Sequence, residues 1–185
     1  TFIPRTERLK NEIAAFSGVA SVMETNRATG NNMGVISDIR SSVDSEKSNI
    51  TCNTINIHHD FSETVAFKIL AGRDFDRTDH HTNWTDVKNI MNIESALDLF
   101  GFESAEDAIG RVLYYYESEA TIVGVANDFH QRSLHHSIDP VIFRPMYGIS
   151  RLLVKLESTP TNGLLSAIRY KYLEVFPGNH YDYYF

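Results

Sequence analysis

The sequence predicts an α+β domain in which helix–strand units near both ends of the chain flank a middle region of short strands. Apolar residues recur at helical spacing over residues 4–17 and again over residues 161–176, and both runs end in Phe-x-Gly, where glycine stops a helix. Between them lie short segments of strand-forming residues, bounded by Gly, Pro and Asn. The 185 residues, 42% of them hydrophobic, are enough to bury a substantial core.

The N-terminal unit is predicted from Leu9, Ile13 and Phe16, which share one helix face, and from Gly18, which ends the helix. A short strand at residues 19–24 follows. The same succession of helix, Phe-x-Gly and strand near the C-terminus hints at a duplicated unit.

Residues 28–48 are rich in Gly, Asn and Ser and have no sustained hydrophobic period. They indicate a long mobile loop, with one weak strand at residues 34–36. Order is predicted to return at residues 51–58, where Cys52 and Ile55 stand among polar neighbours in the imperfect alternation of a half-buried strand.

The remaining elements follow from turn residues, helix caps and period. The predicted middle elements are a helical turn at residues 60–64, a turn at 72–75, a strand at 87–91, a short helix begun by Asn92 and stopped by Gly101, a second one begun by Ser104 and stopped by Gly110, and paired strands at 112–116 and 120–126. The predicted C-terminal elements are strands at residues 141–143 and 151–156, the helix at 161–176 and a final strand at 181–185. The aromatic residues of that last strand are expected to pack under two helices, and a partner-binding surface is the alternative.

Composition limits the partners of the chain. The net charge is −7 and Lys and Arg form no cluster, which argues against nucleic acid as a partner. A single cysteine, Cys52, excludes an intramolecular disulfide. No segment approaches the roughly 20 apolar residues of a membrane span. Because the chain opens on Thr1 rather than methionine, we interpret it as a fragment of a longer protein.

The eight histidines are the main candidates for metal chemistry. Adjacent residues on a strand point to opposite faces, so a His-His pair supplies one ligand per site at most, and the sequence has no His-x-His or His-Glu-x-x-His motif. We therefore predict no metal and no cofactor. The histidines are His58, His59, His80, His81, His130, His135, His136 and His180, and the carboxylates considered with them are Asp60, Asp79 and Asp128.

The segment Asp128-Phe129-His130 raises the question of catalysis, because a carboxylate can orient a neighbouring imidazole as an acid–base group. Ser133 is close in sequence, but a serine, histidine and aspartate within one short loop rarely reach triad geometry. The sequence also has no Gly-x-Ser-x-Gly elbow. We interpret the segment as a polar turn capped by Asp128 and anchored by Phe129, and we predict no catalytic site.

Several motifs follow one another in a fixed order. They are Leu70-Ala71-Gly72-Arg73-Asp74-Phe75, Leu99-Phe100-Gly101, Ala108-Ile109-Gly110-Arg111, Ile122-Val123-Gly124-Val125-Ala126-Asn127-Asp128-Phe129-His130, and Phe176-Pro177-Gly178. In this order, across about residues 8–185, they resemble the periplasmic core domain of MacB/FtsX-like ABC transporter permeases. Residues 28–48 match nothing in that family.

The resemblance implies a fold of two parts: a porter-like helix–strand module over residues 1–59 and 149–185, and an inserted mixed α/β lobe over residues 60–148. It also implies a place at the periplasmic, extracytoplasmic face of the bacterial inner membrane, with transmembrane helices before and after the domain. The residues that carry the family-like structural motif are Gly72, Arg73, Phe75, Gly110, Gly124, Asp128 and Phe129. Gly72 and Gly110 are read as turn residues and Gly124 as a point of close packing.

The function that the resemblance implies is mechanical: the domain couples ATP-driven transmembrane motion to the handling of a substrate or partner outside the membrane, without catalysis. The implied partners are the transmembrane remainder of its own permease, a cytoplasmic ATPase acting through the membrane helices, a second permease copy or repeat, and a periplasmic adaptor. The alternative function is an extracytoplasmic sensor or small-ligand-binding module, which would need a well-formed pocket with convergent polar groups.

Overall fold

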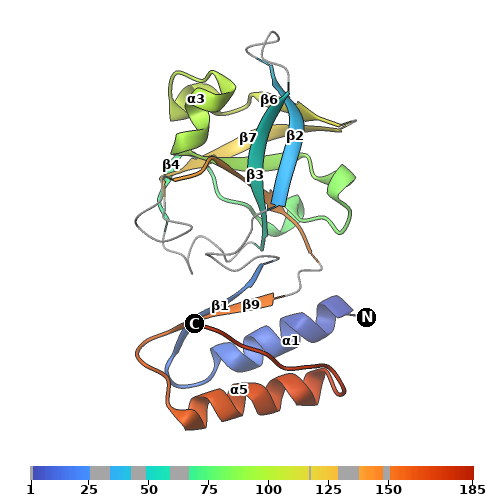
Figure 1. Ribbon diagram of the computed structural model, residues 1–185, viewed down its shortest axis with the longest axis vertical. Helices are drawn as coiled ribbons and strands as arrows, with labels where there is room; N and C mark the ends of the chain where they lie inside the picture. The colour runs from blue at the N-terminus through green and yellow to red at the C-terminus, as the bar shows by residue number, and fades with distance from the viewer. Residues whose placement is uncertain are drawn as a thin grey trace. The chain divides into compact units, whose positions relative to one another are not determined.

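The chain divides into two compact units in the computed structural model, which describes residues 2–25, 34–42, 49–58, 67–116, 118–128, 138–147 and 151–185 (Figure 1). The smaller unit comprises Thr1–Met23 and Leu152–Phe185, and the larger unit comprises Glu24–Arg151. The chain crosses from one to the other twice, within β1 (Val19–Thr25) and at the start of β9 (Arg151–Leu156).

The smaller unit packs α1 (Phe2–Ala14) and α5 (Asn162–Val175) side by side against β1 and β9 (Figure 1). Thr161 caps α5, because its side-chain hydroxyl accepts a hydrogen bond from the Leu164 backbone N–H at 3.2 Å. Both helices, β1 and β9 confirm the prediction from hydrophobic period. The buried core of this unit is Leu9, Ile13, Val19, Val22, Ile168, Val175 and Phe176.

Charged side chains join the two helices at the surface. Arg8 Nε lies 2.8 Å from Glu12 Oε1, and Arg8 Nη2 lies 3.3 Å from Glu174 Oε1. Lys171 Nζ lies 3.4 Å from Glu12 Oε2 and 3.0 Å from Glu174 Oε2. Exposed ion pairs add little stability individually, but this network links α1 to α5 through two cations and two carboxylates.

The larger unit is built on a ring of strands. In spatial order, the strands are β2 (Gly34–Ser41), β6 (Val112–Tyr115), β7 (Ser118–Ala126), β5 (Asn89–Ile93), β8 (Val141–Pro145) and β3 (Ile50–Ile57). Each strand is hydrogen-bonded to the next, and β3 pairs back onto β2, which closes the ring. A closed ring leaves no strand edge of its own unpaired. Outside the ring, β4 (Ile69–Gly72) pairs with β7.

The strand directions define one rim of this ring. The pairs β3–β8 and β5–β7 are parallel, whereas β2–β3, β2–β6, β6–β7 and β5–β8 are antiparallel. It follows that β3, β6 and β8 run in the same direction and end at the same side. We call this side the carboxyl rim and define it by Asn56, Tyr115 and Arg144, which lie at or next to the last position of these strands.

The interior of the ring holds the main hydrophobic core. Its buried members are Ile36, Ile39, Ile50, Cys52, Val87, Ile90, Ala96, Leu97, Phe100, Phe102, Ala108, Leu113, Tyr115, Ala120, Ile122, Val125 and Ile142. Three short helical turns contribute side chains to it: η3 (Glu94–Ala96), α3 (Leu97–Phe100) and α4 (Ala105–Ala108). Two further turns are η1 (Arg77–Asp79) and η2 (Trp84–Asp86). The helix start predicted at Ser104 is confirmed, since its hydroxyl accepts a hydrogen bond from the Asp107 N–H at 3.1 Å.

The weak strand predicted at residues 34–36 is confirmed as the start of β2, but the prediction of a mobile loop is wrong for residues 37–41, which continue this strand. The buried residues Ile36 and Ile39 are three positions apart, because the register of β2 against β3 shifts between them. Asp38 has a φ of 59° within this irregularity. A bulge of this kind removes the strict alternation by which a strand is found in a sequence.

Two further predictions are wrong. Asn92 does not cap a helix, because it is the fourth residue of β5 and is fully buried. The segment at 181–185 forms no strand. Its alternate rings contact one another, Tyr181 and Tyr183 in a tilted arrangement at a centroid separation of 5.9 Å, and Tyr183 and Phe185 edge-on at 5.8 Å. It is therefore not a strand packed under helices, and Phe185 is 85% exposed. The helical turn predicted at residues 60–64 lies outside the described residues.

The first boundary between the two units differs from the one that we predicted at residue 59. The structure places it at Glu24, because β2 and β3 form ladders with β6 and β8 and so belong to the larger unit. The return to the smaller unit at Leu152 lies close to the predicted residue 149. The porter-like character of the smaller unit stays a prediction.

Candidate functional site

Two of the motif glycines lie where β4 and β7 meet. Gly72 and Gly124 are direct partners in this ladder, and Gly72 has a φ of +75°. A Cβ on Gly72 would lie 2.2 Å from the Val123 carbonyl oxygen, and a Cβ on Gly124 would lie 2.2 Å from the Arg73 carbonyl oxygen. The Arg73 N–H donates to Val123 O at 2.9 Å. Both glycines thus permit the close approach of two backbones, which is a scaffold role.

Arg73 continues from this contact into a bidentate ion pair with Asp79. Its Nη1 lies 2.6 Å from Asp79 Oδ2 and its Nη2 lies 3.0 Å from Oδ1. The Asp79 carboxylate, 2% exposed, also accepts hydrogen bonds from Asn89 Nδ2 and from the Asp76 backbone N–H at 2.9 Å. Burial alone would raise the pKa of Asp79, but these donors together lower it to about 2. The ion pair closes the 73–79 segment on itself, and the Asn89 hydrogen bond ties this segment to β5.

A cluster of aromatic and histidine rings follows η1. His80 directly follows η1 and His58 directly follows β3, and their ring centroids lie 5.1 Å apart. Tyr147 contacts both rings, at 5.3 Å from His80 and 5.6 Å from His58. His80 Nδ1 lies 2.8 Å from the Asp76 carbonyl oxygen, and burial lowers the pKa of His80. We call His58, His80 and Tyr147 the histidine cluster.

Sequence reasoning did not bring His58 and His80 together. They are brought close because His81 forms a bridge with Met146, and because Met146 N donates to Ile57 O at 3.2 Å. These are backbone contacts between segments far apart in the chain. The spacing of residues along the sequence does not predict such contacts, so the proximity of the two rings could not be predicted from the sequence.

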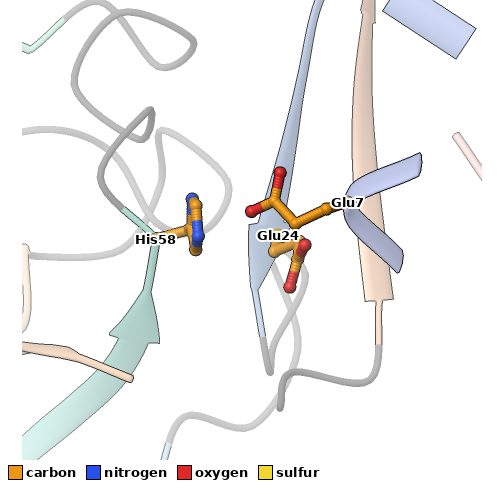
Figure 2. Close-up of side chains that lie close together, drawn as sticks. All are labelled: Glu7, Glu24 and His58. Atoms are coloured by element: carbon orange, nitrogen blue, oxygen red, sulfur yellow. The ribbon is translucent and has the colours of Figure 1, made fainter. Parts of the chain in front are cut away.

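The larger unit also places Glu24 and His58 close together, with ligand atoms within 4.8 Å of each other (Figure 2). Figure 2 draws His58 beyond the end of β3 and Glu24 on β1, and its third labelled residue, Glu7, belongs to α1 of the smaller unit. Both Glu24 and His58 are buried. Zinc sites take three or four protein ligands, so these two side chains do not by themselves make one.

The remaining predicted residues have structural surroundings where the structure describes them. Phe75 is buried and its ring lies 6.3 Å from that of His80. Gly110 has a φ of +80° and donates to Ile122 O at 2.9 Å. Asp128 Oδ1 accepts from the Ser95 N–H, within η3, at 2.8 Å, and the rest of the polar turn predicted from Asp128 lies outside the described residues. Phe129, His130, Ser133, His59, His135, His136 and Asp60 lie outside the described residues.

Comparison with known proteins identifies the fold as that of extracytoplasmic domains of ABC-type transporters. No protein-family model and no curated protein matches the chain. The periplasmic region of MacB from Actinobacillus actinomycetemcomitans is 16% identical, with a TM-score of 0.58 over 91% of this chain and 73% of that one. The extracellular domain of the noncanonic ABC-type transporter YknZ from Gram-positive bacteria is 14% identical, with a TM-score of 0.55 over 88% and 76% of the two chains.

These similarities confirm the α+β class and the MacB-like architecture that the motif order predicted. They hold over nearly the whole chain at low identity, so they define the fold. Among the described residues, no helix has the length and apolar character needed to cross a membrane.

Proposed function

We propose that this chain is the extracytoplasmic domain of an ABC transporter permease, at the periplasmic face of the bacterial inner membrane. We further propose that it couples ATP-driven motion of the membrane helices to the handling of a substrate or partner protein. The observation that carries the proposal is the fold, which matches the MacB periplasmic region over 91% of the chain.

The arrangement of the two units supports a mechanical role. Residues from both ends of the chain, Thr1–Met23 and Leu152–Phe185, form the smaller unit. Membrane helices flanking the domain would therefore act first on the smaller unit, which continues into the larger unit at the two chain crossings. The shared core and the ion pairs between α1 and α5 make a displacement of either helix a displacement of both.

The partners in this proposal are the transmembrane remainder of the permease, a cytoplasmic ATPase, a second permease copy or repeat, and a periplasmic adaptor. The domain itself needs no catalytic residue, because its task is to change position rather than to break a bond. The motif glycines and the Arg73–Asp79 ion pair then serve to keep the larger unit rigid while it moves.

The simplest test is the complete coding sequence. Hydrophobic spans of about 20 residues on both sides of this segment are the expected result. A coding sequence without spans on either side would contradict the membrane placement and would favour a free binding module.

The coupling has its own test in the full-length permease with its ATPase. A spin label at Lys155→Cys, an exposed position of the smaller unit, reports the distance between two copies by pulsed electron paramagnetic resonance. We expect the distance distribution to change between the nucleotide-free and the vanadate-trapped states. An ATPase variant that binds but does not hydrolyse ATP is the control. Identical distributions in all states would contradict the coupling but not the membrane placement.

A further inference from the structure

Arg144 is a half-buried cation without a carboxylate partner among the described residues. It lies on β8 two positions after the core residue Ile142, so its side chain leaves the strand on the same, inward face. Its Nε donates to Asn56 Oδ1 on the neighbouring strand β3 at 3.1 Å. A guanidinium carries five N–H donors, so this bond leaves most of its capacity directed elsewhere.

Tyr115 faces Arg144 from the opposite wall of the ring. Counted either way around the closed ring, β6 and β8 are three strands apart, and both end at the carboxyl rim. Tyr115 is 1% exposed, and its buried Oη has no hydrogen-bond partner among the described residues. Burial raises the pKa of Tyr115 and the Arg144 charge lowers it, so the hydroxyl is within electrostatic reach of the guanidinium.

Tyr116 directly follows β6 at the carboxyl rim and has an unusual backbone. Burial lowers the pKa of Arg144, whereas Tyr115 and Tyr116 raise it. Tyr116 has a φ of 51°, a left-handed conformation that breaks the alternation of β6. Its ring is 58% exposed and meets Trp84 edge-on at a centroid distance of 5.8 Å. Left-handed backbone at a tyrosine is costly, and such strain is concentrated at functional sites.

Further buried polar atoms flank Ile142, which lies two residues before Arg144 on β8. Thr54 and Asn92 are the ladder partners of Ile142 on the two sides of β8. The Thr54 Oγ1 and both amide atoms of Asn92 are buried without a hydrogen-bond partner among the described residues. Buried polar atoms in native proteins are almost always satisfied, so a group of them around one strand calls for a ligand or ordered water.

We propose that Arg144 and Tyr115 form a binding site for a carboxylate at the carboxyl rim of the larger unit, next to Tyr116. The planar guanidinium matches a carboxylate in a bidentate arrangement, and the Tyr115 hydroxyl supplies a further donor from the opposite wall. A carboxylate would also neutralise a partly desolvated cation that has no described acidic partner. A free small acid and an acidic group of a partner protein share this chemistry. The site does not depend on the membrane placement proposed above.

Trp84 is the only tryptophan of the chain and contacts Tyr116, which makes its fluorescence a built-in reporter. The experiment titrates the 185-residue chain with sodium acetate, against sodium chloride at equal ionic strength. We expect a saturable change with acetate that chloride does not reproduce. No saturation below about 100 mM acetate would overturn the proposal.

Variants test the residues. Arg144→Gln is expected to weaken acetate binding at least about tenfold, because it removes the charge and the bidentate geometry. Arg111→Gln is the matched control, since Arg111 is exposed and pairs with Asp107, and it should bind as the parent does. Tyr115→Phe removes only the hydroxyl and should weaken binding to a lesser degree. Near-ultraviolet circular dichroism checks that each variant is folded.

Unchanged acetate affinity in Arg144→Gln would overturn the site. Should Arg144→Gln fail to fold, Tyr115→Phe decides, and unchanged affinity there counts against the proposal in the same way. Tighter binding of inorganic phosphate than of acetate would overturn the carboxylate assignment. A peptide that binds more tightly than acetate, and that loses binding when its C-terminus is amidated, would show that the carboxylate belongs to a partner chain. A peptide that binds with the same affinity as acetate would show that the ligand is a small acid. Both results support the site.

Discussion

The larger and the smaller unit are each stabilised internally by different interactions. The larger unit closes six strands into a ring around one core, and its β4 strand lies directly on β7 at two glycines. The smaller unit packs two helices over two strands, with ion pairs on its surface and an exposed aromatic tail. A closed ring resists deformation because every strand has two partners, whereas a helix pair can shift through small movements of side chains.

This difference fits a division of labour within the proposed function. The smaller unit receives displacement from the membrane side, and the larger unit presents a rigid surface to what lies outside. Substitutions in each unit test this difference.

Gly72→Ala is expected to destabilise the larger unit most. The added Cβ would lie 2.2 Å from the Val123 carbonyl oxygen, at a φ of +75°. We expect a loss of at least about 3 kcal/mol in urea denaturation, or failure to fold. Gly110→Ala is the matched control, because Gly110 has a φ of +80° but its added Cβ would meet no atom within 4 Å. Gly110→Ala should lower the free energy of unfolding by only about 1 kcal/mol. Equal losses for the two variants would show that the close approach of the backbones at Gly72 is not the cause.

Ile13→Ala is expected to destabilise the smaller unit by about 2 to 4 kcal/mol, since it removes buried methyl groups from a small core. Ile13 is 2% exposed, whereas Leu173 on the same unit is 36% exposed and provides the control as Leu173→Ala. Tryptophan fluorescence follows the larger unit, because the only tryptophan, Trp84, lies there. Tyrosines lie in both units, so a tyrosine transition that departs from the tryptophan transition reports the smaller unit. An equal shift of both unfolding transitions would show that the units are not independent.

Arg73→Gln is expected to cost about 2 kcal/mol, because it leaves the buried Asp79 carboxylate without its cation. The lowered pKa of Asp79 sets the pH dependence: the parent gains stability from this ion pair above about pH 4 and loses it as the pH falls towards 2. The Arg73→Gln variant should lose less stability than the parent as the pH falls from about 4 towards 2. Arg111→Gln, at an exposed ion pair, should leave stability unchanged; a similar loss there would mean that burial of Asp79 is not the cause.

His80→Gln is expected to change the pH dependence of stability rather than its value at neutral pH. Burial lowers the pKa of His80, so the unfolded chain binds more protons and the parent loses stability as the pH falls below about 6.5. The slope is at most about 1.4 kcal/mol per pH unit for one group. His58, Asp76 and Asp79 also act on this ring, so thermal melts of His80→Gln are compared with those of the exposed His180→Gln. If the slope of stability against pH is unchanged in His80→Gln, a group other than His80 causes the pH dependence.

Local sequence signals predicted those parts of the fold that local physics decides. Helix period and stop residues located α1 and α5, and the cap at Ser104 located α4. The hairpin of β6 and β7 followed from its two apolar runs. In contrast, only residues 34–36 of β2 were predicted, because the register shift between Ile36 and Ile39 hides the alternation of the full strand. Asn92 resembled a helix cap, yet it lies in a strand that is buried by its neighbours.

The candidate sites were harder to predict, because they depend on ring closure. Arg73 was singled out as part of a motif, but its partner Asp79 was considered only as a metal ligand. His58 and His80 meet through contacts between distant segments, and Arg144 faces Tyr115 only because β6 and β8 lie opposite each other. Such pairings become visible once the strand order is known.

The most direct test of the extracytoplasmic placement uses cysteine accessibility in the full-length protein. The natural Cys52 is 3% exposed, and burial raises its thiol pKa to about 12, so it gives no reactive background. A single added cysteine at the exposed position Glu106 is treated with a membrane-impermeant maleimide in spheroplasts. We expect the maleimide to label Glu106→Cys in intact spheroplasts, without lysis, and to leave the parent protein unlabelled. Labelling that requires lysis would place the domain inside the cell and would contradict the proposed function.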